Sequence, residues 1–244
     1  AEGKTALKWA KEKGHAECVQ AFKTYLGEVA AGRSKAPSAE AGGAGAAVGA
    51  SDAASASSGE GGAEAEPSSG VVPEEVVLAA GRGDEAVVLV WLDGGGRVNA
   101  AFEYVFSNGP VSGVTLLVVA MAHGHEGLAE ALLQRGADLS LQSSDDSTAL
   151  NLAATNGREK LVELALRHGA EINHQTALGN TALMQAAGAG HEKVVDSLIR
   201  HGAAIDLQDN GGDTALIGAA FYGHPAVLLR LLRAGADVTL RSAD

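Results

Sequence analysis

The stretch GDTALIGAAFYGHPAVLLRLLRAGADV, residues 212–238, decides the fold because its landmarks recur along the chain at a step of 33 residues. Its threonine ends a series in which each member is followed two residues later by leucine: Thr115, Thr148, Thr181 and Thr214. Two glycine series keep the same step: Gly124, Gly157, Gly190 and Gly223, and then Gly136, Gly169, Gly202 and Gly235. A fixed period of this kind predicts one supersecondary unit that is copied and stacked into an elongated array.

Within a unit, the residue types predict two short helices and an extended finger. In the third unit Thr148 supplies an N-cap hydroxyl for a first helix that runs to about Thr155. Gly157 ends this helix because glycine readily takes a left-handed backbone. A second helix follows over about 159–167, with leucine and valine at helical spacing along one face. Gly169 then turns the chain into the finger of the next unit.

The pattern of Thr-Ala-Leu, Ala-Ala, Gly-His and Gly-Ala-Asp at this period resembles the ankyrin repeat. The resemblance covers residues 71–244 and, more loosely, residues 3–26, where Thr5, Leu7 and Gly14 match. Ala or Leu stands where the family usually has proline after the threonine. The resemblance implies an all-α solenoid of stacked helix-turn-helix units with hairpin fingers.

Composition divides the chain into three parts. Residues 1–27 read as the end of an upstream ankyrin-like repeat, and the missing initiating Met leads us to expect a piece of a longer protein. In residues 28–70, Ala, Gly, Ser, Glu and Pro make up 38 of 43 positions, which predicts a disordered linker. Residues 71–244 form the array, with repeats predicted at about 73–99, 110–142, 143–175, 176–208 and 209–241.

The first repeat of this array departs from the pattern. It lacks the Thr-x-Leu start, as a terminal unit can where nothing stacks outside it. The spacing from Gly83 to Gly124 exceeds the period by eight residues. The extra residues predict a long finger at about 100–112.

Net charge, hydropathy and cysteine count limit the kinds of partner and compartment that fit this chain. The net charge of −12 argues against a nucleic-acid surface, which needs clustered Lys and Arg. It favours a basic partner surface over an acidic one, although solubility alone also accounts for it. No apolar run is long enough to span a membrane. Cys18 is the single cysteine, which favours a reducing compartment, either cytoplasm or nucleus.

No catalytic or metal-binding pattern emerges from the residue spacing. His125, His191 and His224 occupy the Gly-His slot of their repeats, so neighbouring slots lie about 10 Å apart in a stack. One metal ion needs ligands at about 2 Å, so we expect these histidines to bond to a neighbouring backbone instead. Gly-x-Ser-x-Gly and the phosphate-loop pattern are absent, and we expect neither enzyme activity nor a cofactor.

The resemblance implies a non-catalytic module that binds another protein in a groove formed by the fingers and the first helices. Position within the repeat predicts these groove residues: His123, Asp145, Ser147, Thr155, Asn156, Leu178, Asn180, Asn210, Asp213, Phe221 and Tyr222. The long finger adds three aromatic residues that share one face if the segment is extended: Phe102, Tyr104 and Phe106. Packing within the protein is the competing interpretation for Phe102, Phe106 and Phe221.

Two other functions remain open at this point. The chain could be the regulatory or substrate-recruiting arm of a larger enzyme, such as a kinase or a ubiquitin ligase, whose catalytic domain lies outside these residues. It could also be a structural spacer without a specific partner.

Overall fold

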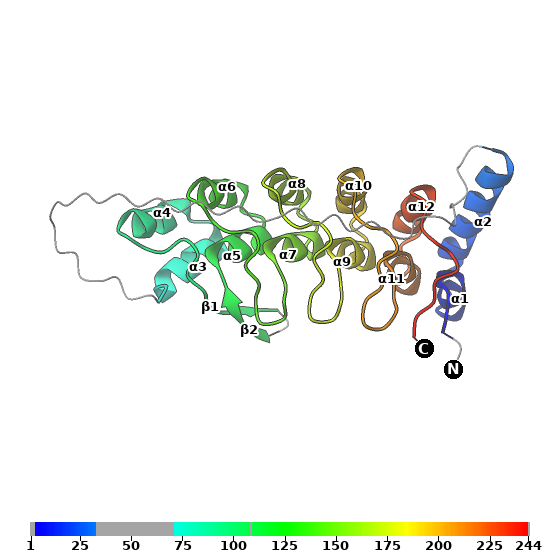
Figure 1. Ribbon diagram of the computed structural model, residues 1–244, viewed down its shortest axis with the longest axis horizontal. Helices are drawn as coiled ribbons and strands as arrows, with labels where there is room; N and C mark the ends of the chain where they lie inside the picture. Colours follow the sequence, from blue (N-terminus) through cyan, green and yellow to red (C-terminus); the bar gives the residue numbers. More distant parts are fainter. Residues whose placement is uncertain (1–2, 33–70, 108, 244) are drawn as a thin grey trace, which may run out of the picture.

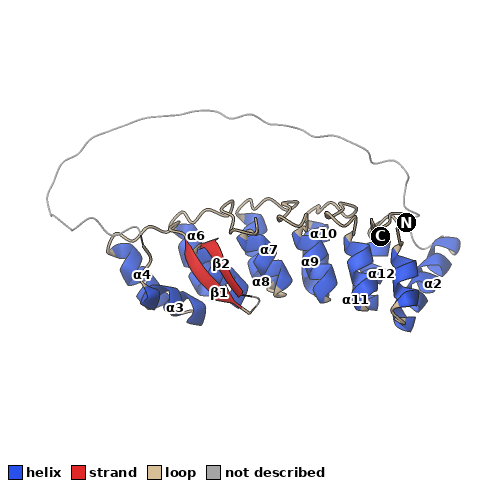
Figure 2. Ribbon diagram, turned by 90° about the horizontal axis from the view of Figure 1, so that it is seen from below, coloured by secondary structure: helices blue, strands red, loops and turns tan. Residues whose placement is uncertain are grey.

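The computed structural model describes residues 3–32, 71–107 and 109–243, and their helices stack in one row (Figure 1). The first helices of the repeats form an inner layer: α1 (Ala6–Glu12), α3 (Glu74–Arg82), α5 (Leu116–His123), α7 (Ala149–Thr155), α9 (Ala182–Ala189) and α11 (Ala215–Tyr222). The second helices form an outer layer: α2 (Ala16–Ala30), α4 (Glu85–Asp93), α6 (Glu126–Gln134), α8 (Glu159–Arg167), α10 (Glu192–Arg200) and α12 (Pro225–Arg233). The fingers project together from one edge of this row (Figure 2). The predicted helical solenoid is confirmed.

Each threonine of the 33-residue series starts an inner helix, as the sequence predicts. The hydroxyl oxygens of these N-caps accept the backbone N–H three residues later at 3.3–3.4 Å: Thr115, Thr148, Thr181 and Thr214. All four threonines are buried. An N-cap of this kind stabilises a helix by about 1 kcal/mol, so each short inner helix depends on its threonine.

The core consists of small aliphatic side chains. The leucine two residues after each threonine is 1% exposed: Leu117, Leu150, Leu183 and Leu216. Paired alanines on the same helices are fully buried, for example Ala186 and Ala187. Because alanine lets neighbouring helices approach closely, a chain with 4% aromatic residues still builds a continuous core.

The Gly-His slot joins each repeat to the preceding one. The ring Nε2 lies 2.9 Å from a backbone carbonyl oxygen of the preceding inner helix in three repeats: His125, His191 and His224. Glycine is needed at Gly190, where φ is +77° and an added Cβ would lie 2.6 Å from the His224 ring. In the third repeat Arg158 replaces histidine, with its Nε 3.4 Å from the carbonyl oxygen of Ala122. The expected backbone role of these histidines is confirmed.

Ion pairs join the outer helices from one repeat to the next. Arg135 pairs with Asp93, and Arg200 pairs with Glu163, at 3.2 and 3.0 Å respectively. Arg230 on α12 pairs with both Glu192 and Asp196 on α10. Exposed pairs of this kind contribute little stability each, about 0–1 kcal/mol. They do, however, link the outer helices of neighbouring repeats.

Residues 3–32 stack as a further repeat on the open side of α11 and α12, with α1 beside α11 and α2 beside α12 (Figure 1). We call the α1–α2 pair the closing repeat. His15 Nε2 lies 3.0 Å from the carbonyl oxygen of Phe221, which continues the histidine series. Arg233 of α12 donates from Nε to Glu28 of α2 at 3.0 Å. The predicted upstream repeat therefore packs onto the array from its C-terminal side.

The closing repeat shares its finger with residues 242–243. In the complete fingers a backbone N–H donates to the carbonyl oxygen four residues later at 3.0 Å: Ser143 to Ser147, Thr176 to Asn180, and Asp209 to Asp213. The N–H of Ser242 makes the equivalent bond, at 3.1 Å, to the carbonyl oxygen of Lys4. Two segments 238 positions apart thus build one finger.

Helix α2 continues to Ala30, three residues into the segment that composition assigned to the linker. Glu28 holds this last turn through Arg233, and Val29 packs against the core. Residues 33–70 of the predicted linker lie outside the described residues. The domain boundaries otherwise remain predictions.

The extra residues of the long finger form a β-hairpin, the one sheet within the described ranges. Strands β1 (Phe102–Phe106) and β2 (Gly109–Val114) are antiparallel and pair Tyr104 with Val111. Along β1, Glu103 and Val105 are exposed, whereas the three aromatic residues are half-buried. The prediction that Phe102, Tyr104 and Phe106 share a face is therefore confirmed.

Cys18 offers a test of how the closing repeat is packed. Its thiol is 0% exposed, and desolvation raises its pKa. Phe22→Ala removes a buried neighbour on α2 and should destabilise the closing repeat by about 3 kcal/mol. A thiol reagent should then label Cys18 about a hundredfold faster than in the wild type.

The exposed neighbour Lys23 provides the control, because Lys23→Ala should leave the labelling rate unchanged. If Cys18 in the wild type reacts as fast as a free thiol, α2 is not packed on α12.

Candidate binding groove

The fingers and the inner helices together present one face, which we call the groove. Backbone hydrogen bonds of 2.8–3.0 Å fix each finger to the next: Ser144 to Ser112, Ala177 to Asp145, and Asn210 to Leu178. On the inner helices, the positions four residues after each N-cap threonine are equivalent: Leu152, Gln185 and Gly218, with Trp9 in the closing repeat, are half-buried, whereas Val119 is 0% exposed. The groove is therefore a regular surface whose side chains differ from repeat to repeat.

The hairpin contributes an aromatic cluster next to α5. The hydroxyl of Tyr104 lies 2.9 Å from His123 Nε2, and the Tyr104 and Phe106 rings lie 4.7 Å apart. The His123 ring stacks with Phe106 at 6.4 Å and with His125 at 6.1 Å. Desolvation, followed by the nearby positive charges of His125 and Arg158, lowers the pKa of His123. This cluster holds the hairpin over the inner layer.

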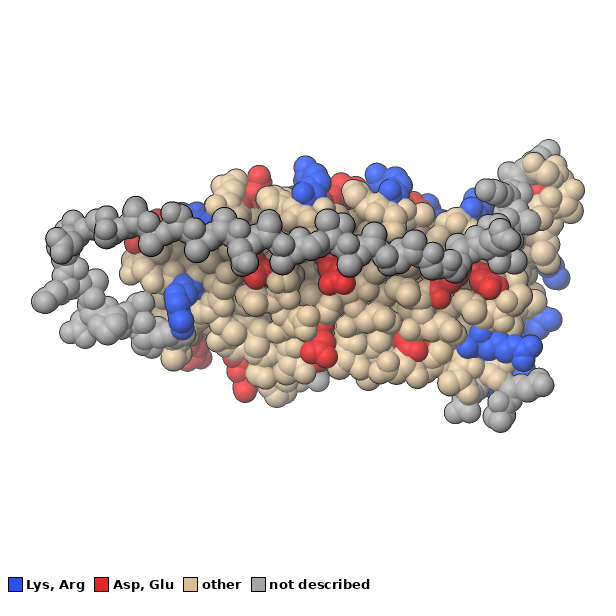
Figure 3. All heavy atoms as spheres, in the orientation of Figure 1, with Lys and Arg blue, Asp and Glu red and all other residues tan. Residues whose placement is uncertain are grey.

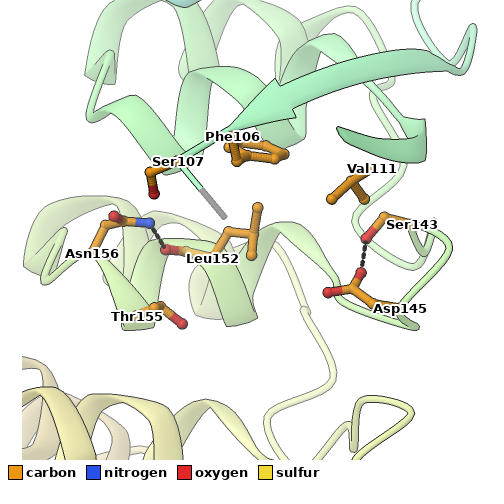
Figure 4. A pocket seen from close by; sticks show the side chains of 8 residues that line it. All are labelled: Phe106, Ser107, Val111, Ser143, Asp145, Leu152, Thr155 and Asn156. Carbon is orange, nitrogen blue, oxygen red and sulfur yellow. Dashed lines mark hydrogen bonds between the residues drawn. The ribbon is translucent and has the colours of Figure 1, made fainter. Parts of the chain in front are cut away.

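A pocket of about 270 Å³ lies between the hairpin and α7 (Figure 4). Phe106, Val111 and Leu152 form its apolar middle. Asp145 lies at one end and Asn156 at the other, and the remaining lining residues are Ser107, Ser143 and Thr155. The structure thus brings Phe106, Asp145, Thr155 and Asn156, all predicted from the sequence, to one place.

Ser147 was predicted to face a partner, but it is 2% exposed. Its hydroxyl donates to Asp145 Oδ2 at 2.9 Å, and the Ser143 hydroxyl donates to Oδ1 at 2.6 Å. Burial raises the pKa of Asp145, but these hydrogen bonds outweigh burial and bring the pKa below its ordinary value. Ser147 therefore positions a groove carboxylate and does not itself reach the surface.

The middle of the groove is mostly polar. Leu178 is exposed at its finger tip, while Asn180 is half-buried. The Asn210 side chain donates to the Ala177 carbonyl oxygen at 2.9 Å and so joins its finger to the preceding one. Asp213 is half-buried, and desolvation, followed by the charge of Asp209, raises its pKa. As partner contacts, these residues remain predictions.

A second aromatic cluster lies where α11 meets the closing repeat. Phe221 packs edge-on against Trp9 at 4.9 Å and against Tyr222 at 5.0 Å. Lys13 Nζ lies 4.1 Å from the Phe221 ring centroid, and Lys4 Nζ lies 4.2 Å from Trp9. Phe221 is half-buried, whereas Tyr222 is 62% exposed. Tyr222 is therefore the ring of this pair that is free to meet a partner.

Sequence reasoning missed Trp9, Lys13 and Leu152. Trp9 and Leu152 lie on inner helices, and Lys13 is the C-cap of α1. Leu152 could have been found from its place four residues after Thr148. Trp9 has the same place after Thr5, but nothing local indicates that its helix and Lys13 lie beside Phe221.

A family model described as ankyrin repeats (3 copies) matches residues 76–176 and 150–242. These matches cover more than half of the chain. The chain belongs to the ankyrin-repeat family. Ankyrin repeats generally act as protein–protein interaction modules and are typically non-catalytic. A search of curated proteins found no match.

Two further findings concern the described part of this ankyrin array. None of its helices combines the length and apolar character needed to cross a membrane. Within the same residues, no group of three or more His, Cys, Asp or Glu side chains is placed to hold a metal ion.

The hairpin of this ankyrin array should be sensitive to pH. The folded-state pKa of His123 lies below the unfolded value. Its contribution to folding stability is therefore complete above about pH 6.5 and is lost as the pH falls through the folded-state pKa. The free energy of unfolding, measured with denaturant, should therefore fall more for the wild type than for His123→Gln when the pH is lowered from about 7.5 to about 5.5. Parallel losses in the two proteins would contradict a neutral, packed His123.

Proposed function

We propose that this chain is a non-catalytic scaffold that holds a partner protein in the groove between its fingers and its inner helices. The observation that carries this proposal is the exposed Tyr222, supported from behind by Phe221 and Trp9. Tyrosine presents a large contact area at low entropic cost, and aromatic anchors dominate the energetics of many interfaces. The equivalent positions of three other repeats hold His123, Asn156 and Ala189, so the phenol ring is particular to this repeat.

The distribution of charge supports the same surface. Figure 3 shows Lys and Arg at the closing repeat, at the opposite end of the row and along its upper edge, with Asp and Glu between them, including over the middle of the array. Lys4 and Lys13 lie against the Trp9 and Phe221 rings at the closing repeat, and Asp145 and Asp146 lie in the finger of the third repeat. Two charge signs along one face favour a partner with a matching order of charges and can fix its direction.

The test is capture of partners from a cell lysate with the full chain, followed by mass spectrometry. Tyr222→Ala should weaken binding of groove partners about tenfold or more, while helix content measured by circular dichroism stays unchanged. The single variant is preferable to one that includes Phe221, since Phe221 also packs against the closing repeat.

Val90→Ala is a matched control because Val90 is also exposed but lies on the outer helix α4. It should leave capture unchanged. Equal recovery of every partner by Tyr222→Ala and the wild type would place the binding surface elsewhere.

A further inference from the structure

The pocket between the hairpin and α7 combines apolar walls with a carboxylate at one end (Figure 4). Phe106 and Val111 reach it from the hairpin, and Leu152 reaches it from α7. The Asn156 side chain at the other end already donates to the Leu152 carbonyl oxygen at 2.8 Å. A side chain that fills this pocket would therefore meet hydrocarbon along its length and Asp145 at its tip.

Asp145 is held in one position before any partner arrives. Its Oδ1 accepts from the Ser143 hydroxyl and its Oδ2 from the Ser147 hydroxyl, while the Ser147 backbone N–H also points to Oδ1 at 3.4 Å. Because Ser143 and Ser147 are buried, these bonds anchor the carboxylate to the finger. A partner that binds it has little side-chain entropy left to remove.

The charge of Asp145 has no counter-ion inside the pocket. Among the described residues that line it, Asp145 alone carries a charge. The next residue in the finger, Asp146, adds a second negative charge. The lysines of the groove, Lys4 and Lys13, lie at the closing repeat, three repeats away at roughly 10 Å per repeat.

We propose that this pocket binds one lysine or arginine side chain of the partner, with its methylene stem against Phe106, Val111 and Leu152 and its cationic head on Asp145. Long basic side chains bury their stems on apolar surface and keep the charge at the end, which matches this order of lining residues. A purely apolar side chain would cover the carboxylate without neutralising it, and an acidic one would be repelled.

The inference rests on the proposed function, because it identifies what the groove partner inserts. The probe is a display library of random peptides selected on the full chain. Peptides that bind the groove should share one Lys or Arg, and replacing it with norleucine should weaken binding about tenfold or more. Asp145→Asn should cause the same loss, and rising salt should reduce the difference between the wild type and this variant.

Asp146→Asn is the matched control, since it removes the same charge from the adjacent residue, which lies outside the pocket. It should change peptide affinity much less than Asp145→Asn does. The side-chain amide that Asp145→Asn introduces can still accept from the Ser143 hydroxyl at Oδ1, and its Nδ2 can donate to the Ser147 hydroxyl oxygen in place of the bond that Oδ2 accepted.

The outcomes separate the two proposals. Peptides that lose affinity with Tyr222→Ala but bind Asp145→Asn as well as the wild type would overturn the basic pocket and leave the groove intact. Equal losses of affinity in Asp145→Asn and Asp146→Asn would also overturn it, because they would show that the peptide responds to the total negative charge of the finger and not to the Asp145 carboxylate. Failure to select any peptide sensitive to groove substitutions would count against both proposals.

Discussion

The stacking of each helix pair on its neighbours is the interaction on which the rest of the structure depends. A pair of short helices cannot bury its apolar face alone, so every repeat needs the next one. The histidine or arginine that reaches back to the preceding inner helix fixes the spacing between pairs. The glycine that receives the ring keeps that approach possible. Once this contact repeats, the fingers line up as a consequence.

This dependence explains how the surface is divided between structure and recognition. Leucines and alanines of both layers are buried between stacked helices, and charged residues of the outer layer such as Arg230 form ion pairs between repeats. The groove residues are less constrained, so Leu152, Gln185, Gly218 and Trp9 can differ at one equivalent position. A repeat protein can thus vary its binding face while it keeps its core.

The sequence predicted the features that local chemistry determines. Thr148 caps the N-terminus of its helix and Gly190 ends its helix in a left-handed conformation. Threonine and glycine play these roles in every repeat where they occur, so the helices and their order could be predicted. Ser147 was misassigned because its neighbours in sequence do not reveal that its hydroxyl turns inward to Asp145. The pocket was missed as a unit because it requires the hairpin to dock on α7, which depends on packing over distance. For the same reason, the cluster around Phe221 could be predicted only in part.

The shared finger of Ser242 and Lys4 has a consequence for how the molecule acquires its shape. Contacts in the array lie within a repeat or join neighbouring repeats and can form quickly, whereas the closing repeat must wait for a partner 238 positions away. During synthesis residues 3–30 emerge before α11 and α12 exist, although they are the last to find their place. Until then the apolar side of α12 stays uncovered, which makes this interval the time when a nascent chain is most open to pairing with the wrong neighbour.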